Sequence, residues 1–171
     1  MSDTTALPQK KNHKVYSLVF CRKLGEGDEP LILLGLKKRG FGEGKMNGYG
    51  GKIDVGETIV NCAKRELLEE STLVALELEH VASLEFDMPA QLMLVECFLC
   101  SKFEGTATET EEMSPLWVRE TDLPTLFKEG RTWADDSYWL PLVLQGKQIN
   151  GRFRYIDNET IDSYSIFEPI T

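Results

Sequence analysis

The fold of this chain is decided by one stretch, Gly51-Lys-Ile-Asp-Val-Gly-Glu57-Thr58-Ile-Val-Asn-Cys-Ala-Lys-Arg65-Glu66-Leu-Leu-Glu69-Glu70-Ser71-Thr72-Leu73. Thr58 carries a side-chain oxygen that can accept a hydrogen bond at the start of a helix. Apolar residues then recur every four positions, the spacing of one helix face: Ile59, Ala63 and Leu67. The stretch therefore predicts a helix from a cap at Thr58 to about Ser71.

Three glutamates, Glu66, Glu69 and Glu70, share one sector of this predicted helix, within about 60° of Glu66 on either side. Like charges three and four residues apart repel by about 0.2–0.5 kcal/mol per pair. The C-terminal half of a helix also disfavours anions by about 0.3–1 kcal/mol each. A divalent cation would reverse both terms, and carboxylate ligands suit Mg²⁺ or Mn²⁺ better than zinc. An acidic, solvated face without a metal is the alternative.

A glycine-rich segment, Arg39 to Lys52, precedes the helix and contains six glycines. We expect a loop there, because glycine adopts backbone conformations that other residues resist. Such a turn before a helix can bring backbone amides close to phosphates. The segment lacks the spacing of a P-loop and of a dinucleotide-binding fingerprint.

The remaining elements are read from apolar and β-branched runs, with a second helix expected at Asp136–Gln145. The mix of strands and helices predicts an α/β sandwich with two main helices and a mixed central sheet. The expected strands are Val15–Cys21, Leu31–Leu36, Val81–Met88, Gln91–Cys100, Leu116–Val118 and Phe153–Tyr155.

The chain has 171 residues and a net charge of −9, which we interpret as one domain with an acidic surface. An acidic surface argues against a DNA or RNA polymer as partner, because such binding depends on phosphate neutralisation. No apolar run approaches the roughly 18 residues of a membrane span. We expect a disordered tail at residues 1–14, a single domain at residues 15–171, and residence in the cytosol.

The cysteines do not suggest a metal site, because Cys97-x-x-Cys100 has no second pair and no nearby histidine. Cys97 and Cys100 fall in an expected strand, where residues three apart point to opposite faces. We therefore interpret the four cysteines as buried or half-buried thiols in a reducing compartment.

The spacing of the opening stretch resembles a known signature, G-x5-E-x7-R-E-[aliphatic]-x-E-E-x-G-[aliphatic], that of the Nudix hydrolases. Eight of its nine fixed positions match, from Gly51 through Glu57 and Arg65 to Leu73. Thr72 departs from the pattern, because the family has glycine there. A left-handed helix cap at a β-branched residue costs about 1 kcal/mol or more, so we expect a tilted or remodelled helix end.

Three further segments resemble the animal MutT-homologue branch of that family: Lys37–Gly42, Asn47–Lys52 and Trp133–Trp139. Members of the branch hydrolyse oxidised purine nucleoside triphosphates such as 8-oxo-dGTP and 2-oxo-dATP, and so sanitise the nucleotide pool. The resemblance implies the Nudix α/β/α sandwich, a small-molecule nucleotide as partner and a monomer, and it leaves the nucleus and mitochondrion open besides the cytoplasm.

The resemblance also implies a metal site and a catalytic group. It places Mg²⁺, with Mn²⁺ as the alternative ion, on ligands from the loop, the helix and a later acidic stretch: the Gly50 carbonyl, Glu66, Glu69, Glu70 and Glu112. Glu70 is our first choice for orienting or deprotonating the attacking water, with Glu66 second. Arg65 is expected to pair with Glu57 and to hold the loop.

Base recognition is expected outside the signature. Trp133 offers a stacking face, with a core tryptophan as the alternative. Asp135 and Asp136 can share one proton and so present a donor and an acceptor; either could instead cap a helix. Asn47 can contact a purine edge, or serve only in a turn. The resemblance adds Ser17 and Lys37. Phe41, Phe86 and Met93 are expected to form apolar walls, with core packing as the alternative for each, and Met46 stands where branch members have tryptophan.

Two other interpretations stay open. The chain could be a Nudix enzyme for an undamaged nucleotide, a nucleotide sugar or a dinucleoside polyphosphate. It could also be an inactive nucleotide-binding module that kept the fold. The intact charged residues Arg65, Glu66, Glu69 and Glu70 argue against inactivity, and Thr72 argues weakly for it.

Overall fold

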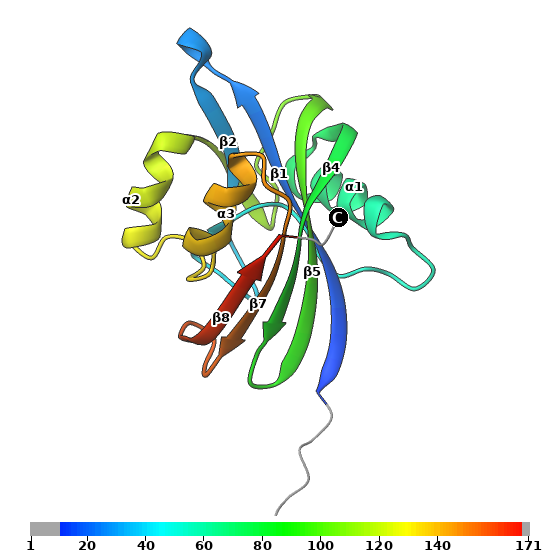
Figure 1. Ribbon diagram of the computed structural model, residues 1–171. Helices are drawn as coiled ribbons and strands as arrows, with labels where there is room; N and C mark the ends of the chain where they lie inside the picture. The colour runs from blue at the N-terminus through cyan, green and yellow to red at the C-terminus, as the bar shows by residue number, and fades with distance from the viewer. Residues whose placement is uncertain (1–10, 169–171) are drawn as a thin grey trace, which may run out of the picture.

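A computed structural model describes residues 11–168 and arranges the strands in one eight-stranded sheet (Figure 1). Seven strands follow the order β3-β2-β1-β5-β4-β7-β8, and β6 pairs with β2. The β1–β5 and β4–β7 pairs are parallel and the other pairs are antiparallel, so the sheet is mixed as expected. The strands are β1 (Asn12–Leu24), β2 (Pro30–Lys37), β3 (Met46–Asn47), β4 (Val74–Asp87), β5 (Gln91–Glu104), β6 (Met113–Arg119), β7 (Ile149–Tyr155) and β8 (Ile161–Phe167).

Helices cover both faces of the sheet, with α1 (Ile59–Ser71) on one face and α2 (Leu123–Lys128) and α3 (Asp136–Leu144) on the other (Figure 1). The α/β/α sandwich is therefore confirmed, and α2 is a third helix that the sequence did not predict. Short 3-10 turns occur at Glu26–Asp28 and Glu120–Asp122. No helix within residues 11–168 is long and apolar enough to cross a membrane.

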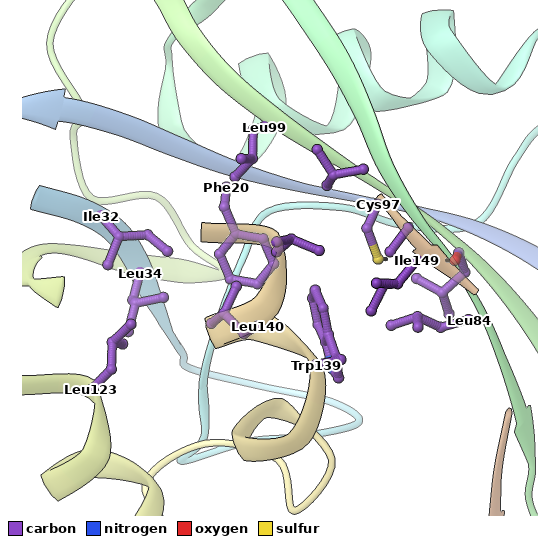
Figure 2. Packing of buried hydrophobic residues seen from close by; sticks show 14 of the residues in the cluster. Phe20, Ile32, Leu34, Leu84, Cys97, Leu99, Leu123, Trp139, Leu140 and Ile149 are labelled. Carbon is purple, nitrogen blue, oxygen red and sulfur yellow. Dashed lines mark hydrogen bonds between the residues drawn. The ribbon is translucent and has the colours of Figure 1, made fainter. Parts of the chain in front are cut away.

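The core is divided into two apolar clusters, one on each face of the sheet. On the α3 side, Trp139 and Leu140 pack against buried residues of the strands (Figure 2). On the α1 side, Ala63 and Leu67 pack against a second set. Cys97 belongs to the first cluster and Cys100 to the second, so the prediction that they point to opposite faces is confirmed.

The boundaries of several elements differ from expectation. Residues 12–14 belong to β1, so the predicted tail is wrong for them, and residues 1–10 lie outside the described part of the chain. β4 begins at Val74 rather than at the predicted Val81. Its first half was not recognised as a strand, because buried and exposed residues alternate there and acidic side chains interrupt the apolar ones. β3 and β8 were not predicted; β8 is a largely exposed edge strand in which only Ile161 and Ile166 are partly buried. Helix α3 ends at Leu144, one residue before the predicted Gln145, and contains Pro141 in its interior.

Helix α1 forms as predicted, because its local signals are satisfied. The Thr58 side chain accepts a hydrogen bond from the Asn61 N–H at 3.2 Å. At the other end, Thr72 adopts the left-handed conformation with φ +66°, and its N–H donates to the Leu68 carbonyl. The expected remodelling of this cap is wrong: the helix ends in the ordinary left-handed way although the residue is threonine.

Candidate active site

Two glycines bring the loop against both β1 and α1. The loop pairs with β1 through the Ser17 N–H, which donates to the Gly51 carbonyl at 2.9 Å. A Cβ at Gly50 would collide with the Ser17 carbonyl, and a Cβ at Gly51 would collide with the Glu66 carboxylate. Only glycine permits this approach, which places Gly50 beside the glutamates of α1.

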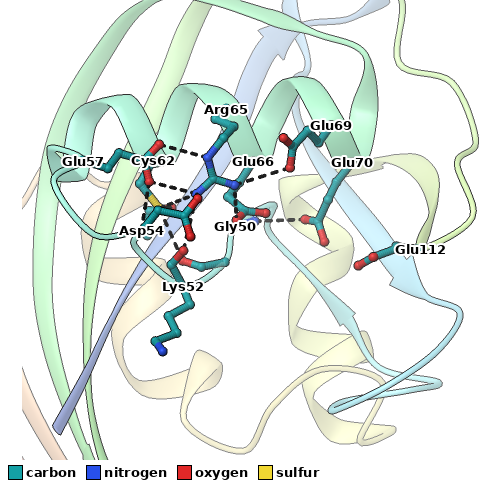
Figure 3. Close-up of polar contacts among 12 residues, drawn as sticks. Gly50, Lys52, Asp54, Glu57, Cys62, Arg65, Glu66, Glu69, Glu70 and Glu112 are labelled. Atoms are coloured by element: carbon teal, nitrogen blue, oxygen red, sulfur yellow. Dashed lines mark hydrogen bonds and ion pairs between the residues drawn. The ribbon is translucent and has the colours of Figure 1, made fainter.

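Arg65 organises the start of the site (Figure 3). Its guanidinium binds Glu57 through two hydrogen bonds of 2.9 Å and donates to Glu66 at 2.7 Å. The pair expected between Arg65 and Glu57 is thus present. The hydrogen bond from Arg65 lowers the pKa of Glu57 to about 2. The resulting carboxylate–guanidinium fork connects the loop to α1.

Glu70 is the most enclosed of the three helix glutamates, with its residue only 5% exposed. Burial raises its pKa, against the opposing effects of Lys37 and of the Gly50 N–H, which donates to it at 3.1 Å. Burial also raises the pKa of Glu66. Both carboxyls are therefore shifted toward neutral pH, where a group exchanges protons most effectively in catalysis.

The glutamates line a small cavity of about 270 Å³ together with residues that precede β6. Lys37 lies between two of these side chains, 3.1 Å from Glu70 and 3.2 Å from Glu112. Hydrogen bonds from Arg39 and Lys37 lower the pKa of Glu112. The residues around this cavity are Glu66, Glu69, Glu70, Thr110, Glu111 and Glu112.

The donor chemistry of this cavity fits a divalent metal ion. Across residues 11–168, no three acidic, histidine or cysteine side chains already converge in a metal-binding arrangement. Instead, Lys37 and Arg65 supply the positive charge that the carboxylates require. Carboxylate oxygens and a nearby backbone carbonyl are the ligands that Mg²⁺ takes.

A larger cavity of about 520 Å³ shares Gly50, Glu70 and Glu112 with this cluster. The nine residues expected to bind substrate all line it: Ser17, Lys37, Phe41, Asn47, Phe86, Met93, Trp133, Asp135 and Asp136. They come from β1, β2, the glycine-rich segment with β3, β4, β5, and the residues just before and at the start of α3. The fold therefore gathers at one cavity residues that are more than 100 positions apart in the chain.

Aromatic rings form one wall of this cavity. Trp133 is half-buried and stacks on Phe41, with ring centroids 5.0 Å apart and an interplanar angle of 25°. Trp133 is thus not a core tryptophan. Asn47 lies in strand β3 rather than in a turn, and its side-chain oxygen accepts the Gly48 N–H at 2.8 Å. Met46 is buried in the core cluster on the α3 side.

Asp135 and Asp136 are almost completely buried at the cavity, 4% and 3% exposed. The Trp139 indole N–H donates to Asp135 Oδ2 at 2.8 Å, and the Tyr155 hydroxyl donates to Asp135 Oδ1 at 2.6 Å. Asp136 Oδ2 accepts the Trp133 N–H at 3.0 Å. Asp135 precedes α3 without a side-chain cap bond, so the capping alternative is wrong for it.

Sequence reasoning missed Trp139 and Tyr155. Trp139 lies four residues after Asp135, one turn along α3, and this spacing could have indicated the contact. Tyr155 lies in β7, twenty residues from Asp135. Its approach depends on the parallel pairing of β7 with β4, which has no local signal in the sequence.

Comparison with known proteins agrees with this geometry. The pattern that defines the NUDIX domain matches residues 12–143. The chain is 48% identical to the oxidized purine nucleoside triphosphate hydrolase of Mus musculus, over 80% of this chain and 86% of the relative. The protein of the same name from Danio rerio is 41% identical over the same shares. The crystal structure of a MutT protein from Bacillus halodurans has the same fold, with a TM-score of 0.75 and 21% identity, covering 90% of this chain and 97% of that one.

Proposed function

This chain belongs to the NUDIX domain family, and on that basis we propose that it hydrolyses oxidised purine nucleoside triphosphates, such as 8-oxo-dGTP and 2-oxo-dATP, to the monophosphate and pyrophosphate. This proposal rests on one observation: the cavity expected to bind the base is continuous with the cluster of glutamates. The cavity that contains Trp133 and both aspartates also contains Gly50 and Glu70. A purine bound at the first end would therefore direct its phosphates toward the glutamates. Such an activity would remove damaged nucleotides before they are used.

Proteins of this family use divalent metal ions, and we assign Mg²⁺ here, with Mn²⁺ as the alternative. When bound, such an ion neutralises phosphate charge and lowers the pKa of a coordinated water. The residues that would hold it come from the loop, α1 and the segment before β6: Gly50 through its carbonyl, Glu66, Glu69, Glu70 and Glu112.

The side chains of this site have different roles in the reaction. Glu70 orients the attacking water and accepts its proton, because burial already raises the pKa of this carboxyl. Glu66 is the second choice for that role. Arg65 and Glu57 are positioning residues, since their fork fixes the loop against α1. Lys37, which lies beside Glu70 and Glu112, can follow the substrate phosphates.

The opposite end of the cavity recognises the base. Trp133 and Phe41 supply aromatic faces for a purine. Asp135 and Asp136, sharing one proton, offer an acceptor and a donor to its edge, and Asn47 offers an amide. Ser17, Phe86 and Met93 complete the walls.

The same proposal covers how the protein exists in the cell. We assign it a single catalytic domain reaching from β1 to the C-terminal residues, a monomeric state and a small-molecule nucleotide as its partner. Its acidic net charge of −9 disfavours nucleic acid polymers. We place it in the cytoplasm, with the nucleus and mitochondrion as further compartments to examine.

A substrate panel tests this proposal. Pyrophosphate or phosphate release is measured from 8-oxo-dGTP, 2-oxo-dATP, dGTP and ADP-ribose, each with Mg²⁺ and with EDTA. We expect the two oxidised purines to have the highest kcat/KM, and only with Mg²⁺. A preference for ADP-ribose or for undamaged dGTP would point to a different Nudix substrate. Binding without turnover of any nucleotide would point to an inactive module.

A further inference from the structure

Asp135 is held by two donors that belong to the protein itself. Trp139 donates to one carboxylate oxygen and Tyr155 to the other, at 2.8 and 2.6 Å. An indole N–H can only donate, so a proton cannot be placed on Oδ2 without losing that bond. A proton on Oδ1 would instead be donated to the Tyr155 oxygen, so the phenol would change from a donor to a charged group into an acceptor from a neutral one. Hydrogen bonds to an ionised carboxylate are the stronger kind, so the two internal donors together stabilise the ionised form of Asp135.

Asp136 is in a different position, although it is equally buried. One of its oxygens accepts the Trp133 N–H, which leaves the other oxygen available for a proton. Two adjacent buried negative charges are unfavourable, so the second carboxyl of the pair stays protonated. Burial, followed by the charge of Asp135, raises the pKa of Asp136 well above its usual range.

The other ionisable groups near the pair do not change this assignment. Lys45 lowers the pKa of Asp136, but less than burial and Asp135 raise it. Burial and then Asp135 raise the pKa of the Cys97 thiol, which stays neutral. Burial and the charge of Asp135 also raise the pKa of Tyr155. The phenol therefore keeps its proton and remains a donor.

We propose that the Tyr155 hydroxyl is a specificity-determining group, which makes the enzyme discriminate between oxidised guanine and oxidised adenine by holding the charge on Asp135 and the proton on Asp136. This inference rests on the proposed function. 8-Oxoguanine carries oxygen at C6 and an amino group at C2, whereas 2-oxoadenine carries them the other way round. A fixed order of acceptor and donor thus fits one base and opposes the other.

Binding of the disfavoured base requires a proton shift within the pair. The proton leaves Asp136 and binds Asp135 Oδ1, and the Tyr155 hydroxyl turns to accept a hydrogen bond from it. A charge-assisted hydrogen bond is thereby replaced by a weaker neutral one, and this cost falls only on the disfavoured base. Tyr155 therefore acts through Asp135 and does not need to touch the nucleotide.

The test is the variant Tyr155→Phe, which keeps the ring in β7 and removes only the hydroxyl. We expect the wild type to have unequal kcat/KM values for 8-oxo-dGTP and 2-oxo-dATP. In the variant, their ratio should move toward unity by at least about tenfold, the effect of one hydrogen bond to a charged group. Tyr138→Phe is the matched control, because Tyr138 is exposed and lies outside the residues that line the cavity; it should keep the wild-type ratio.

Binding of the product nucleotides separates this inference from the proposed function. Calorimetry with 8-oxo-dGMP and 2-oxo-dAMP in EDTA needs neither metal nor turnover. The ratio of the two Kd values should fall in Tyr155→Phe as the ratio of kcat/KM does. Asp136→Asn, which mimics the protonated acid, should keep the wild-type preference, and Asp135→Asn should lose it.

An unchanged ratio in Tyr155→Phe overturns the inference, as does a wild-type preference retained in Asp135→Asn. If the wild type discriminates between the bases and Tyr155→Phe does so to the same degree, the proposed function stands and only the role of Tyr155 is removed. A wild type that neither binds these monophosphates nor hydrolyses the triphosphates overturns both. A purely structural effect of the substitution would weaken both substrates alike and leave their ratio constant.

Discussion

At the scale of the residue, the buried aspartates make stability depend on pH in a defined direction. Burial raises the pKa of Asp136 in the folded state well above its ordinary value of 3.8. The unfolded chain releases this proton at lower pH than the folded chain does. Stability contributed by the protonated acid is therefore complete below about pH 4 and is lost as the pH rises toward the folded-state pKa.

Asp136→Asn should remove the loss of stability that Asp136 causes as the pH rises. The amide can still accept the Trp133 N–H and needs no proton to be neutral. We expect the variant to be more stable than the wild type at pH 7, and the difference to disappear near pH 3. Urea unfolding at several pH values measures this. An equal or lower stability of the variant at pH 7 would show that Asp136 is ionised in the folded protein.

Arg65 has the opposite electrostatic effect on Glu57. Hydrogen bonding to the guanidinium lowers the pKa of Glu57 to about 2 from an ordinary 4.5. This contribution to stability is present above about pH 4.5 and is lost as the pH falls toward 2. Arg65→Lys replaces the fork by a single charge, so Glu57 should then titrate closer to 4.5, as carboxyl NMR would measure.

The same variant should slow the reaction. Arg65 also positions Glu66, and loss of that geometry should lower kcat by about 10²-fold. Lys102→Arg, a change at an exposed residue of β5, serves as the control and should retain kcat. If Arg65→Lys keeps full activity, Arg65 is only a surface residue of the helix.

At the scale of the element, the C-terminus of α1 shows how a residue that departs from the family pattern is accommodated. The Thr72 hydroxyl lies 2.8 Å from the Thr108 hydroxyl and donates to the Thr106 carbonyl at 2.9 Å. These bonds tie the helix end to the loop before β6. A left-handed conformation costs a residue with a Cβ roughly 1–2 kcal/mol, and the hydroxyl bonds offset part of that cost.

Substitutions of Thr72 separate the strain from the hydrogen bonds. Thr72→Ala keeps the strained backbone and loses both contacts, so it should destabilise the protein by about 1–2 kcal/mol. Thr72→Gly loses the contacts but also relieves the strain, so its stability should be close to that of the wild type. Denaturant unfolding of the three proteins measures this order. A glycine variant as unstable as the alanine variant would contradict the inference that the left-handed backbone at Thr72 is strained.

Local signals explain which elements could be predicted. Helix α1 was placed within one residue at each end, because Thr58 and the apolar spacing act within a few residues. β8 was missed because it lies at the sheet edge and most of its side chains face solvent. The early half of β4 was missed for a related reason, since alternating acidic residues hide its pairing with β5.

At the scale of the whole molecule, the candidate site forms because the order of the strands in the sheet brings distant residues together. The three glutamates of α1 that we assign to the metal site lie in one contiguous signature, so the sequence alone could locate them. The cavity residues were assigned by resemblance, and the sheet brings all nine together. Tyr155 could not be inferred, because its contact with Asp135 requires β7 to lie beside β4 and α3 to cover that face.

Metal binding should stabilise the whole fold. Lys37 pairs with Glu70 and Arg65 pairs with Glu66, and a bound Mg²⁺ would satisfy the glutamates directly. At 100 times its Kd, Mg²⁺ should add about 2.7 kcal/mol to the free energy of unfolding and raise Tm. Calorimetric scans with Mg²⁺ and with EDTA measure this shift. A Tm that is equal in the two conditions would contradict metal binding by the folded chain.

We propose that Glu70 and its neighbours perform metal-dependent hydrolysis at the end of the base cavity. The most direct measurement is pyrophosphate release from 8-oxo-dGTP during a Mg²⁺ titration, comparing the wild type with Glu70→Gln. We predict saturable activation of the wild type and at least about 10²-fold lower kcat in the variant, with the fold retained. Turnover that needs no metal, or full activity of Glu70→Gln, would contradict the assignment of this site.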